Sequence, residues 1–89
     1  MHQLVRKSTA GTMESSDVFV ELEPAGQIEI EIESVVYAQF GDAIENTVRD
    51  VLQKQGVTGA RVRLHDRGAL ECVLRARVET AVRRGREER

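Results

Sequence analysis

A strict alternation of apolar and polar residues constrains the fold of this chain more than any other feature. Residues 28–33 read IEIEIE, residues 17–24 read DVFVELEP, and residues 60–66 read ARVRLHD. A period of two residues predicts β-strands with one apolar and one polar face. The chain must therefore cover the apolar face of a small sheet. The predicted core positions on this face are Val18, Val20, Leu22, Ile28, Ile30, Ile32, Val62 and Leu64.

Two other segments have the period of an α-helix, from about residue 35 to 55 and from about residue 69 to 84. Ser34 is a candidate N-cap of the first helix, and Gly56 is a candidate for ending it. Gly41 lies inside this helix, where glycine costs about 1 kcal/mol relative to alanine, so we expect another group to pack closely against it. The apolar stripes are Val36, Phe40, Ala43, Ile44, Val48, Val51 and Leu52 in the first helix, and Leu70, Val73, Leu74, Val78, Ala81 and Val82 in the second.

The order strand, strand, helix, strand, helix predicts an α+β domain. We expect a small three- to four-stranded sheet with two helices packed on one face. Pro24-Ala25-Gly26 favours a tight turn, which predicts that the first two strands pair as a hairpin. No linker divides the 89 residues, so we expect one domain over 1–89 with flexible ends at 1–9 and 85–89. A domain of this size buries only about 60% of its unfolded surface, which favours a stabilising partner.

Charge is distributed unevenly along the chain, although the net charge is only −2. Residues 14–33 contain seven acidic residues and no lysine or arginine, whereas residues 61–89 contain nine arginines against five acidic residues. Two interpretations are open: two solvated faces of opposite sign, or docking faces for other subunits, with Arg75 and Arg77 on the basic helix. Aromatic residues make up 3% of the chain, which argues against a nucleic-acid-binding surface.

The sequence offers no set of residues for catalysis. MESSD lacks the G-x-S-x-G motif of serine hydrolases, and His65 alternates outward on its strand, as a surface histidine does. Glu29, Glu31 and Glu33 fit the polar side of a strand better than an acid–base pair. Cys72, the single cysteine, lacks metal-ligand spacing and is expected to be half-buried in the second helix. No apolar run approaches the ~20 residues of a membrane span, and we expect a cytoplasmic protein that is not an enzyme on its own.

The stretch AGTMESSDV, residues 10–18, leaves two interpretations open. A serine beside Asp17 at the start of a strand is typical of a local turn, in which the hydroxyls of Ser15 and Ser16 bind nearby N–H groups. Alternatively, one hydroxyl lies on a short exposed loop where a modifying enzyme can bring its oxygen in line with a phosphorus. The residues alone favour the turn.

Three separated segments resemble the acyl carrier (gamma) subunit of citrate lyase. They are AGTMESSDV at 10–18, QFGDAI at 39–44 and DRGALECVLRARVE at 66–79, in the same order and with similar spacing as in that family. The resemblance implies that Ser15 carries a prosthetic group, 2′-(5″-phosphoribosyl)-3′-dephospho-coenzyme A, through a phosphodiester. The thiol of this group ends a phosphopantetheine arm. Ser16 is then a neighbour and not the attachment point.

The resemblance also implies roles for the residues around Ser15 and for partner proteins. Gly11, Thr12, Glu14 and Asp17 match the rest of the family motif and would shape the loop that the prosthetic-group transferase recognises. The chain would be a non-catalytic subunit whose arm carries acetyl and citryl thioesters while citrate is cleaved to acetate and oxaloacetate. The implied partners are the alpha (acyl transferase) and beta (citryl lyase) subunits, the transferase, and an acetate ligase that acetylates the thiol.

Two interpretations from other classes remain open. One is an α+β interaction or regulatory module without a cofactor. The other is a stand-alone hydrolase that uses Ser15 and His65, which requires His65 to point toward the loop. The acyl carriers of fatty-acid synthesis are four-helix bundles, but the alternating segments demand strands and no Asp-Ser-Leu motif occurs. We therefore expect a shared role without a shared fold.

Overall fold

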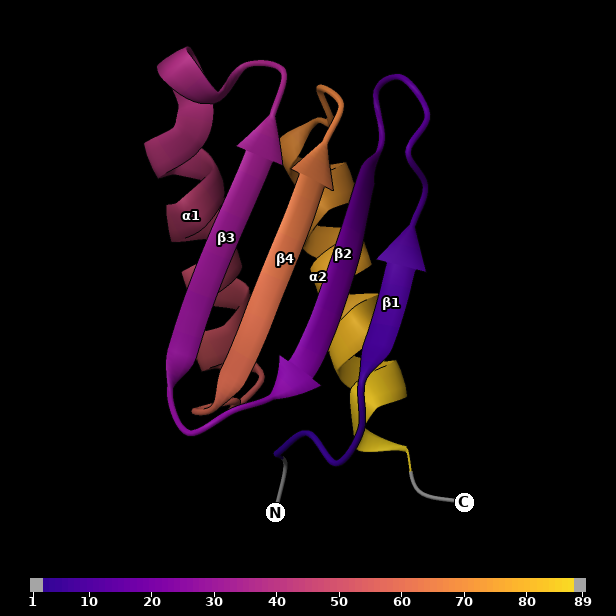
Figure 1. Ribbon diagram of the computed structural model, residues 1–89, viewed down its shortest axis with the longest axis vertical. Coiled ribbons are helices and arrows are strands. Elements are labelled where there is room, and N and C mark those ends of the chain that lie inside the picture. Colours follow the sequence, from indigo (N-terminus) through magenta and orange to yellow (C-terminus); the bar gives the residue numbers. More distant parts are fainter. Residues whose placement is uncertain (1–2, 88–89) are drawn as a thin grey trace.

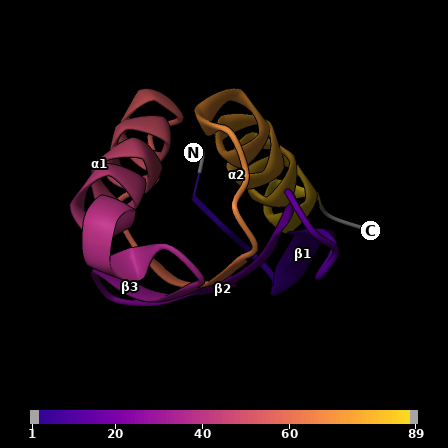
Figure 2. The same cartoon turned by 90° about the horizontal axis from the view of Figure 1, so that it is seen from above.

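Four strands form one sheet, and two helices lie over one of its faces (Figure 1, Figure 2). The computed structural model describes residues 3–87. The elements in chain order are β1 (Ser8–Gly11), β2 (Val18–Pro24), β3 (Ile28–Ser34), α1 (Tyr37–Lys54), β4 (Ala60–Asp66) and α2 (Glu71–Arg86). The predicted α+β fold with both helices on one face is confirmed. Neither helix within residues 3–87 is long and apolar enough to span a membrane.

The strand order is β1-β2-β4-β3, so β4 lies between β2 and β3. β4 pairs antiparallel with β2 and parallel with β3. The predicted hairpin of β2 and β3 is therefore wrong. The turn after β2 reverses the chain but packs against the start of β4. There the Ala60 amide donates to the Gln27 carbonyl over 3.2 Å, and a Cβ on Gly59 would lie 2.1 Å from the Ala25 oxygen.

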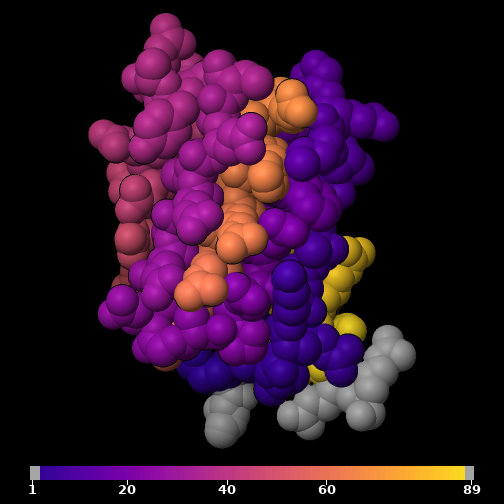
Figure 3. Space-filling view, viewed as in Figure 1, coloured from indigo at the N-terminus to yellow at the C-terminus, as the bar shows by residue number. Residues whose placement is uncertain are grey.

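Charge on the polar face of the sheet explains why β4 separates the two strands. Arg61 lies opposite Glu23 of β2 and Glu29 of β3 and binds their carboxylates at 3.1 and 3.0 Å. Arg63 occupies the same kind of position one row further along, and Figure 3 shows side chains of β4 running between those of β3 and β2. A β2–β3 hairpin would instead place glutamates opposite glutamates, which is destabilising. The strand acids and arginines therefore share one face, and the interpretation of two faces of opposite sign is wrong for the sheet.

The core lies between the apolar face of the sheet and the inner faces of both helices. The predicted core positions on β2 and β4 are buried, and the isoleucines of the edge strand β3 are partly buried. Three residues of the predicted helical stripes are exposed instead: Phe40 (51% exposed) and Ala43 in α1, and Leu70 (70% exposed) just before α2. All three line a groove between the first turns of the two helices. Cys72 is exposed and not half-buried, because it lies about 200° around α2 from the buried Leu74.

Strand β1 was not predicted. Its sequence, STAG, has no apolar alternation, but it pairs with β2, and the buried Ser8 hydroxyl donates to the Ala81 carbonyl at 2.6 Å. Parts of both expected flexible ends are consequently in secondary structure, since residues 8–9 belong to β1 and residues 85–86 to α2. Residues 1–2 and 88–89 of those ends lie outside the described residues.

The starting residues of both helices, and the N-cap of α1, differ from the prediction. Both helices begin two residues later than the sequence pattern indicates, α1 at Tyr37 and α2 at Glu71. The residue at the N-cap position of α1 is Val36, so the prediction of Ser34 as the cap is wrong. The Ser34 hydroxyl instead donates to the Asp66 carboxylate at 2.7 Å and accepts from the Val36 amide at 3.1 Å.

Two predictions about glycines in and after α1 are confirmed. Gly56 follows the C-cap with φ +74°, and its amide donates to the Gln53 carbonyl at 3.0 Å, as in a glycine-terminated helix. Gly41 is buried beneath the ring of Tyr37, one turn earlier in the same helix, whose nearest atom would lie 2.7 Å from an added Cβ.

We predict that Leu22→Ala will lower the free energy of unfolding by about 2–5 kcal/mol, because Leu22 is fully buried in a strand paired on both sides. Urea unfolding followed by circular dichroism measures this change. Val35→Ala is the matched control at a position that is 65% exposed, and it should cost less than about 0.5 kcal/mol. Equal losses in the two variants would contradict the assignment of the core.

Candidate functional site

The loop of residues 12–17 connects β1 to β2 at the end of the sheet where β3 and β4 also terminate (Figure 1). Its own polar groups close it into a turn. The Asp17 amide donates to the Glu14 carbonyl at 3.1 Å, and the Glu14 amide donates to the Thr12 hydroxyl at 3.2 Å. The Thr12 hydroxyl in turn donates to Asp17 Oδ2 at 2.6 Å. The shape of the loop therefore depends on Thr12 and Asp17.

The Asp17 carboxylate is the centre of this arrangement and accepts four hydrogen bonds. Besides Thr12, its donors are the Val18 amide at 2.7 Å and both Nε and Nη2 of Arg77, at 3.0 and 2.8 Å. Such a two-point guanidinium–carboxylate pair is geometrically specific. The hydrogen bonds from Arg77 and Thr12 lower the pKa of Asp17 from its ordinary value of 3.8 to about 2, against the opposing effect of burial. The carboxylate is thus held ionised and is not available as a proton acceptor.

Arg77 was missed as a member of this site. The sequence suggested that Arg75 and Arg77 together form a basic docking face. Instead, Arg77 faces the loop, while Arg75 binds Asp50 of α1 at 2.8 Å and Glu71 at 3.0 Å. No local pattern could reveal the pairing of Arg77 with a residue 60 positions earlier. The only signal was that both lie in segments that match one family.

The loop is also attached to the turn between β4 and α2. The Ser16 amide donates to the Arg67 carbonyl at 2.9 Å, and the Arg67 amide donates to the Asp17 carbonyl at 2.9 Å. Ser16 adopts the left-handed conformation with φ +67°. Gly11 precedes the loop with φ +93°, and a Cβ there would lie 1.8 Å from the Val18 carbonyl oxygen, so only glycine fits.

Ser15 lies in the turn of this loop and is exposed to solvent. Its hydroxyl forms no hydrogen bond to any group within residues 3–87, and neither does that of Ser16. The interpretation in which the serine hydroxyls bind nearby N–H groups is therefore wrong, because Thr12 and Asp17 fill that role. The structure brings Gly11, at the end of β1, together with Thr12, Glu14, Ser15 and Asp17 of the loop, and Glu14 is exposed beside Ser15.

His65 points outward, as predicted, on the polar face of the sheet. Its Nδ1 lies 2.9 Å from Glu33 Oε1, and its ring lies against Phe19 with centroids 6.2 Å apart. The contacts of His65 are with Glu33, Glu21 and Phe19, and no hydrogen bond joins it to Ser15 among the described residues. Within residues 3–87, no cluster of His, Cys, Asp and Glu side chains could hold a metal ion.

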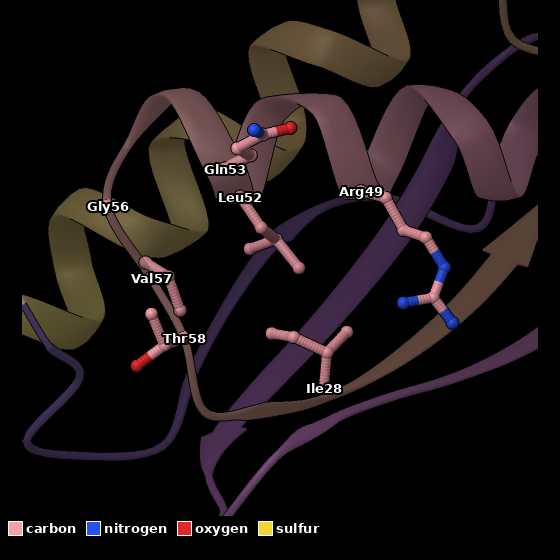
Figure 4. Close-up of a pocket in the computed structure, with 7 residues that line it drawn as sticks. All are labelled: Ile28, Arg49, Leu52, Gln53, Gly56, Val57 and Thr58. Atoms are coloured by element: carbon pink, nitrogen blue, oxygen red, sulfur yellow. The ribbon is translucent and has the colours of Figure 1, made fainter.

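A hollow of about 340 Å³ lies at the opposite end of α1 (Figure 4). Ile28 and Leu52 point toward each other across it, and Arg49 binds Glu45 at 2.9 Å. The hydroxyl of Thr58, which also lines it, donates to Gln3 at 3.2 Å. The hollow therefore offers no free reactive group, and the loop around Ser15 is the better candidate site.

Comparison with known proteins gives the family. The family model described as ACP, malonate decarboxylase delta subunit (MdcD), matches residues 5–85. A citrate lyase acyl carrier protein of Haemophilus influenzae (strain PittEE) is 51% identical over 86 residues, covering 97% of this chain and 90% of that protein. The chain belongs to the citrate lyase acyl carrier protein family.

Other members of the family have similar identities. The citrate lyase acyl carrier protein of Escherichia fergusonii is 50% identical over 97% of this chain and 91% of its own length. The citrate lyase acyl carrier protein 2 of Salmonella typhimurium (strain LT2) is 48% identical over the same shares. A chain in the crystal structure of a Pseudomonas malonate decarboxylase hetero-tetramer has the same fold, with a TM-score of 0.78 and 22% identity over 89% of this chain and 82% of that chain.

We predict that the stabilising effect of Asp17 depends on pH. Because the pKa of Asp17 is lower in the folded chain than its ordinary value, its contribution is fully present above about pH 4 and is lost as the pH falls to about 2. Asp17→Asn should thus be less stable than the wild type by about 1–2 kcal/mol at pH 7, a range reduced because Arg77 is partly exposed. Urea unfolding between pH 7 and pH 2.5 should show this difference shrinking below pH 4. Glu79→Gln removes a charge from an exposed position and should change stability little at any pH.

We also predict that Gly11→Ala will destabilise the chain by more than about 2 kcal/mol, because both its positive φ and the Val18 carbonyl oppose a Cβ. Gly26→Ala is the matched control, since no atom lies within 4 Å of a Cβ there. Gly68 separates the two causes: its φ is +91°, but the space beside it is open, so Gly68→Ala should have an intermediate effect. Thermal unfolding of the three variants tests this order, and a neutral Gly11→Ala would contradict it.

Proposed function

We propose that this chain is the acyl carrier subunit of a citrate lyase and that Ser15 carries the prosthetic arm through a phosphodiester. One observation carries the proposal: Ser15 presents an exposed hydroxyl that forms no hydrogen bond to the described residues. It lies on a loop whose shape is fixed by the hydrogen bonds from Thr12 and Arg77 to the Asp17 carboxylate. A hydroxyl that accepts a phosphorus must be reachable from solvent and free of competing contacts. The relatives named citrate lyase acyl carrier protein, about 50% identical over nearly the whole chain, support the same role.

The residues around Ser15 fit the implied group, 2′-(5″-phosphoribosyl)-3′-dephospho-coenzyme A. Ser15 would hold it, and the space above the loop is open to solvent. When attached, this group supplies a thiol that carries acetyl and citryl groups as thioesters. The Asp17 carboxylate does not serve as a base toward Ser15, because it already accepts four hydrogen bonds. Under this proposal the transferase supplies the base.

The other motif residues divide into two roles under this proposal. Gly11, Thr12 and Asp17 set the shape of the loop through the close approach to Val18 and the four hydrogen bonds of the carboxylate. Glu14 has an exposed side chain beside Ser15, and the transferase would contact this side chain directly. Arg77 joins the first group because it positions Asp17.

The partners follow from the carrier role. We propose that the alpha subunit transfers the acyl group, the beta subunit cleaves the citryl thioester, the transferase loads Ser15, and an acetate ligase acetylates the thiol. Tethering the acyl group to one chain raises its effective concentration at each partner. The related fold in a malonate decarboxylase hetero-tetramer supports a subunit of a larger complex. The role requires no catalytic set on this chain.

We predict that the chain, co-expressed with active arm synthase and transferase, will gain the mass of the arm on Ser15. Ser15→Ala should abolish the gain. Ser16→Gly is the matched control, because glycine tolerates the positive φ at this position and the neighbouring hydroxyl is removed without strain. Intact mass with fragment mapping measures the modification. If the wild type stays unmodified with proven partners, the carrier role is wrong and an interaction module without a cofactor becomes the better explanation.

A further inference from the structure

Large apolar side chains are exposed mainly at the end of the molecule that bears the Ser15 loop. The loops that follow β1, β3 and β4 all meet at this end (Figure 1). We call these exposed side chains the apolar end: Met13 (47% exposed), Val35 (65%), Tyr37 (54%), Phe40 (51%) and Leu70 (70%). Val5, which is 50% exposed, lies in the segment before β1 and outside this cluster. Clustered exposed apolar residues on a soluble domain mark an interaction surface.

The apolar end is continuous with the Ser15 loop. Met13 of the loop lines a hollow of about 280 Å³ together with Val35 and Arg67. Asp66 borders this hollow and also a groove of about 380 Å³ between the starts of α1 and α2, which Phe40 and Leu70 line. The backbone hydrogen bonds from Ser16 to Arg67 and back from Arg67 to Asp17 join the loop to the edge of this surface.

The positions of two apolar residues oppose the stability of the isolated chain. Val36 and Leu70 occupy the N-cap positions of α1 and α2, and neither helix has a side-chain hydrogen bond at its cap. Serine, threonine, aspartate or asparagine at these positions would stabilise the helices. Leu70 also exposes most of its side chain to water. A residue that breaks local preferences without a gain in the fold points to a functional contact.

We propose that the apolar end is the surface on which the transferase that loads Ser15 docks. This inference rests on the proposed function. In the loading step, the Ser15 Oγ bonds to the phosphorus of an activated phosphate ester of the arm, its proton goes to a base on the transferase, and the activating group leaves with its electron pair. An enzyme that forms this bond must cover the loop of residues 12–17, so its footprint extends over the adjoining hollow and groove. The transferase therefore presents an aliphatic or aromatic surface beside its active site that receives Phe40 and Leu70.

The test is the steady-state kinetics of loading by purified transferase and its arm donor. Leu70→Ser and Phe40→Ser should each raise KM for this chain roughly fivefold or more while kcat changes little. Val5→Ser, the matched control, should leave KM unchanged. Leu70→Ser also supplies the missing N-cap, so its Tm should rise by about 2–8 °C, which separates lost docking from lost folding.

Inhibition by chains that cannot be loaded measures docking directly. Ser15→Ala should inhibit loading of the wild type with an inhibition constant close to the wild-type KM. The double variant Ser15→Ala with Leu70→Ser should inhibit roughly fivefold or more weakly. This comparison does not depend on transfer to the inhibiting chain.

Four other outcomes would overturn the proposed docking surface, and each would point to a different explanation. If the wild type is loaded and Leu70→Ser and Phe40→Ser have the same KM as the wild type, the docking surface is wrong but the carrier role stands. No loading of the wild type by active transferase overturns both. If the variants convert a dimer to a monomer in sedimentation with unchanged KM, the surface binds a second copy of the chain. If they change only the alkylation rate of the arm thiol in the isolated loaded chain, the surface covers the arm itself.

Discussion

The position of β4 between β2 and β3 determines the rest of the architecture. Its arginines lie between two rows of glutamates that could not have paired with each other. Each of these ion pairs is partly exposed and individually weak, but together they make this strand order preferable to a hairpin. With β4 in the middle, β3 and β4 run in the same direction, and their connections to α1 and α2 emerge beside the loop between β1 and β2 (Figure 1). The Ser15 loop and both helix starts therefore meet at one end.

Two aspartates hold these connections together. Asp17 binds Arg77 of α2, which attaches the Ser15 loop to the helix layer. Asp66, which is 4% exposed, accepts a hydrogen bond from the Ser34 hydroxyl at 2.7 Å and one from the Ala69 amide at 3.0 Å. It thus joins the end of β3 to the approach to α2. Both carboxylates accept hydrogen bonds on both of their oxygens within the described chain, whereas the hydroxyl of Ser15 forms no hydrogen bond there.

Sequence patterns predicted the secondary structure better than the arrangement of the strands. The alternation in IEIEIE identified β3 and its buried face, and the helical stripes identified both helices, since these patterns depend on neighbouring residues. The order of the strands depends on pairs such as Glu29 and Arg61, which lie 32 positions apart. The opposite charges were visible in the sequence, but the sequence did not indicate which strands they would join. β1 was missed because it is held by pairing and by one buried hydroxyl. The motif located the loop, but its support by Arg77 appeared only in three dimensions.

The attachment of the Ser15 loop has a mechanical consequence. The loop is anchored to α2 through Arg77, to the turn before α2 through Arg67, and to β2 through the close approach of Gly11 to Val18. A group bonded to Ser15 would consequently pivot about a point that is fixed relative to the sheet. The region it sweeps would be a cap centred on that point, with a radius set by the length of the arm alone. Each partner that holds the domain in one orientation would then meet the cargo within the same defined volume.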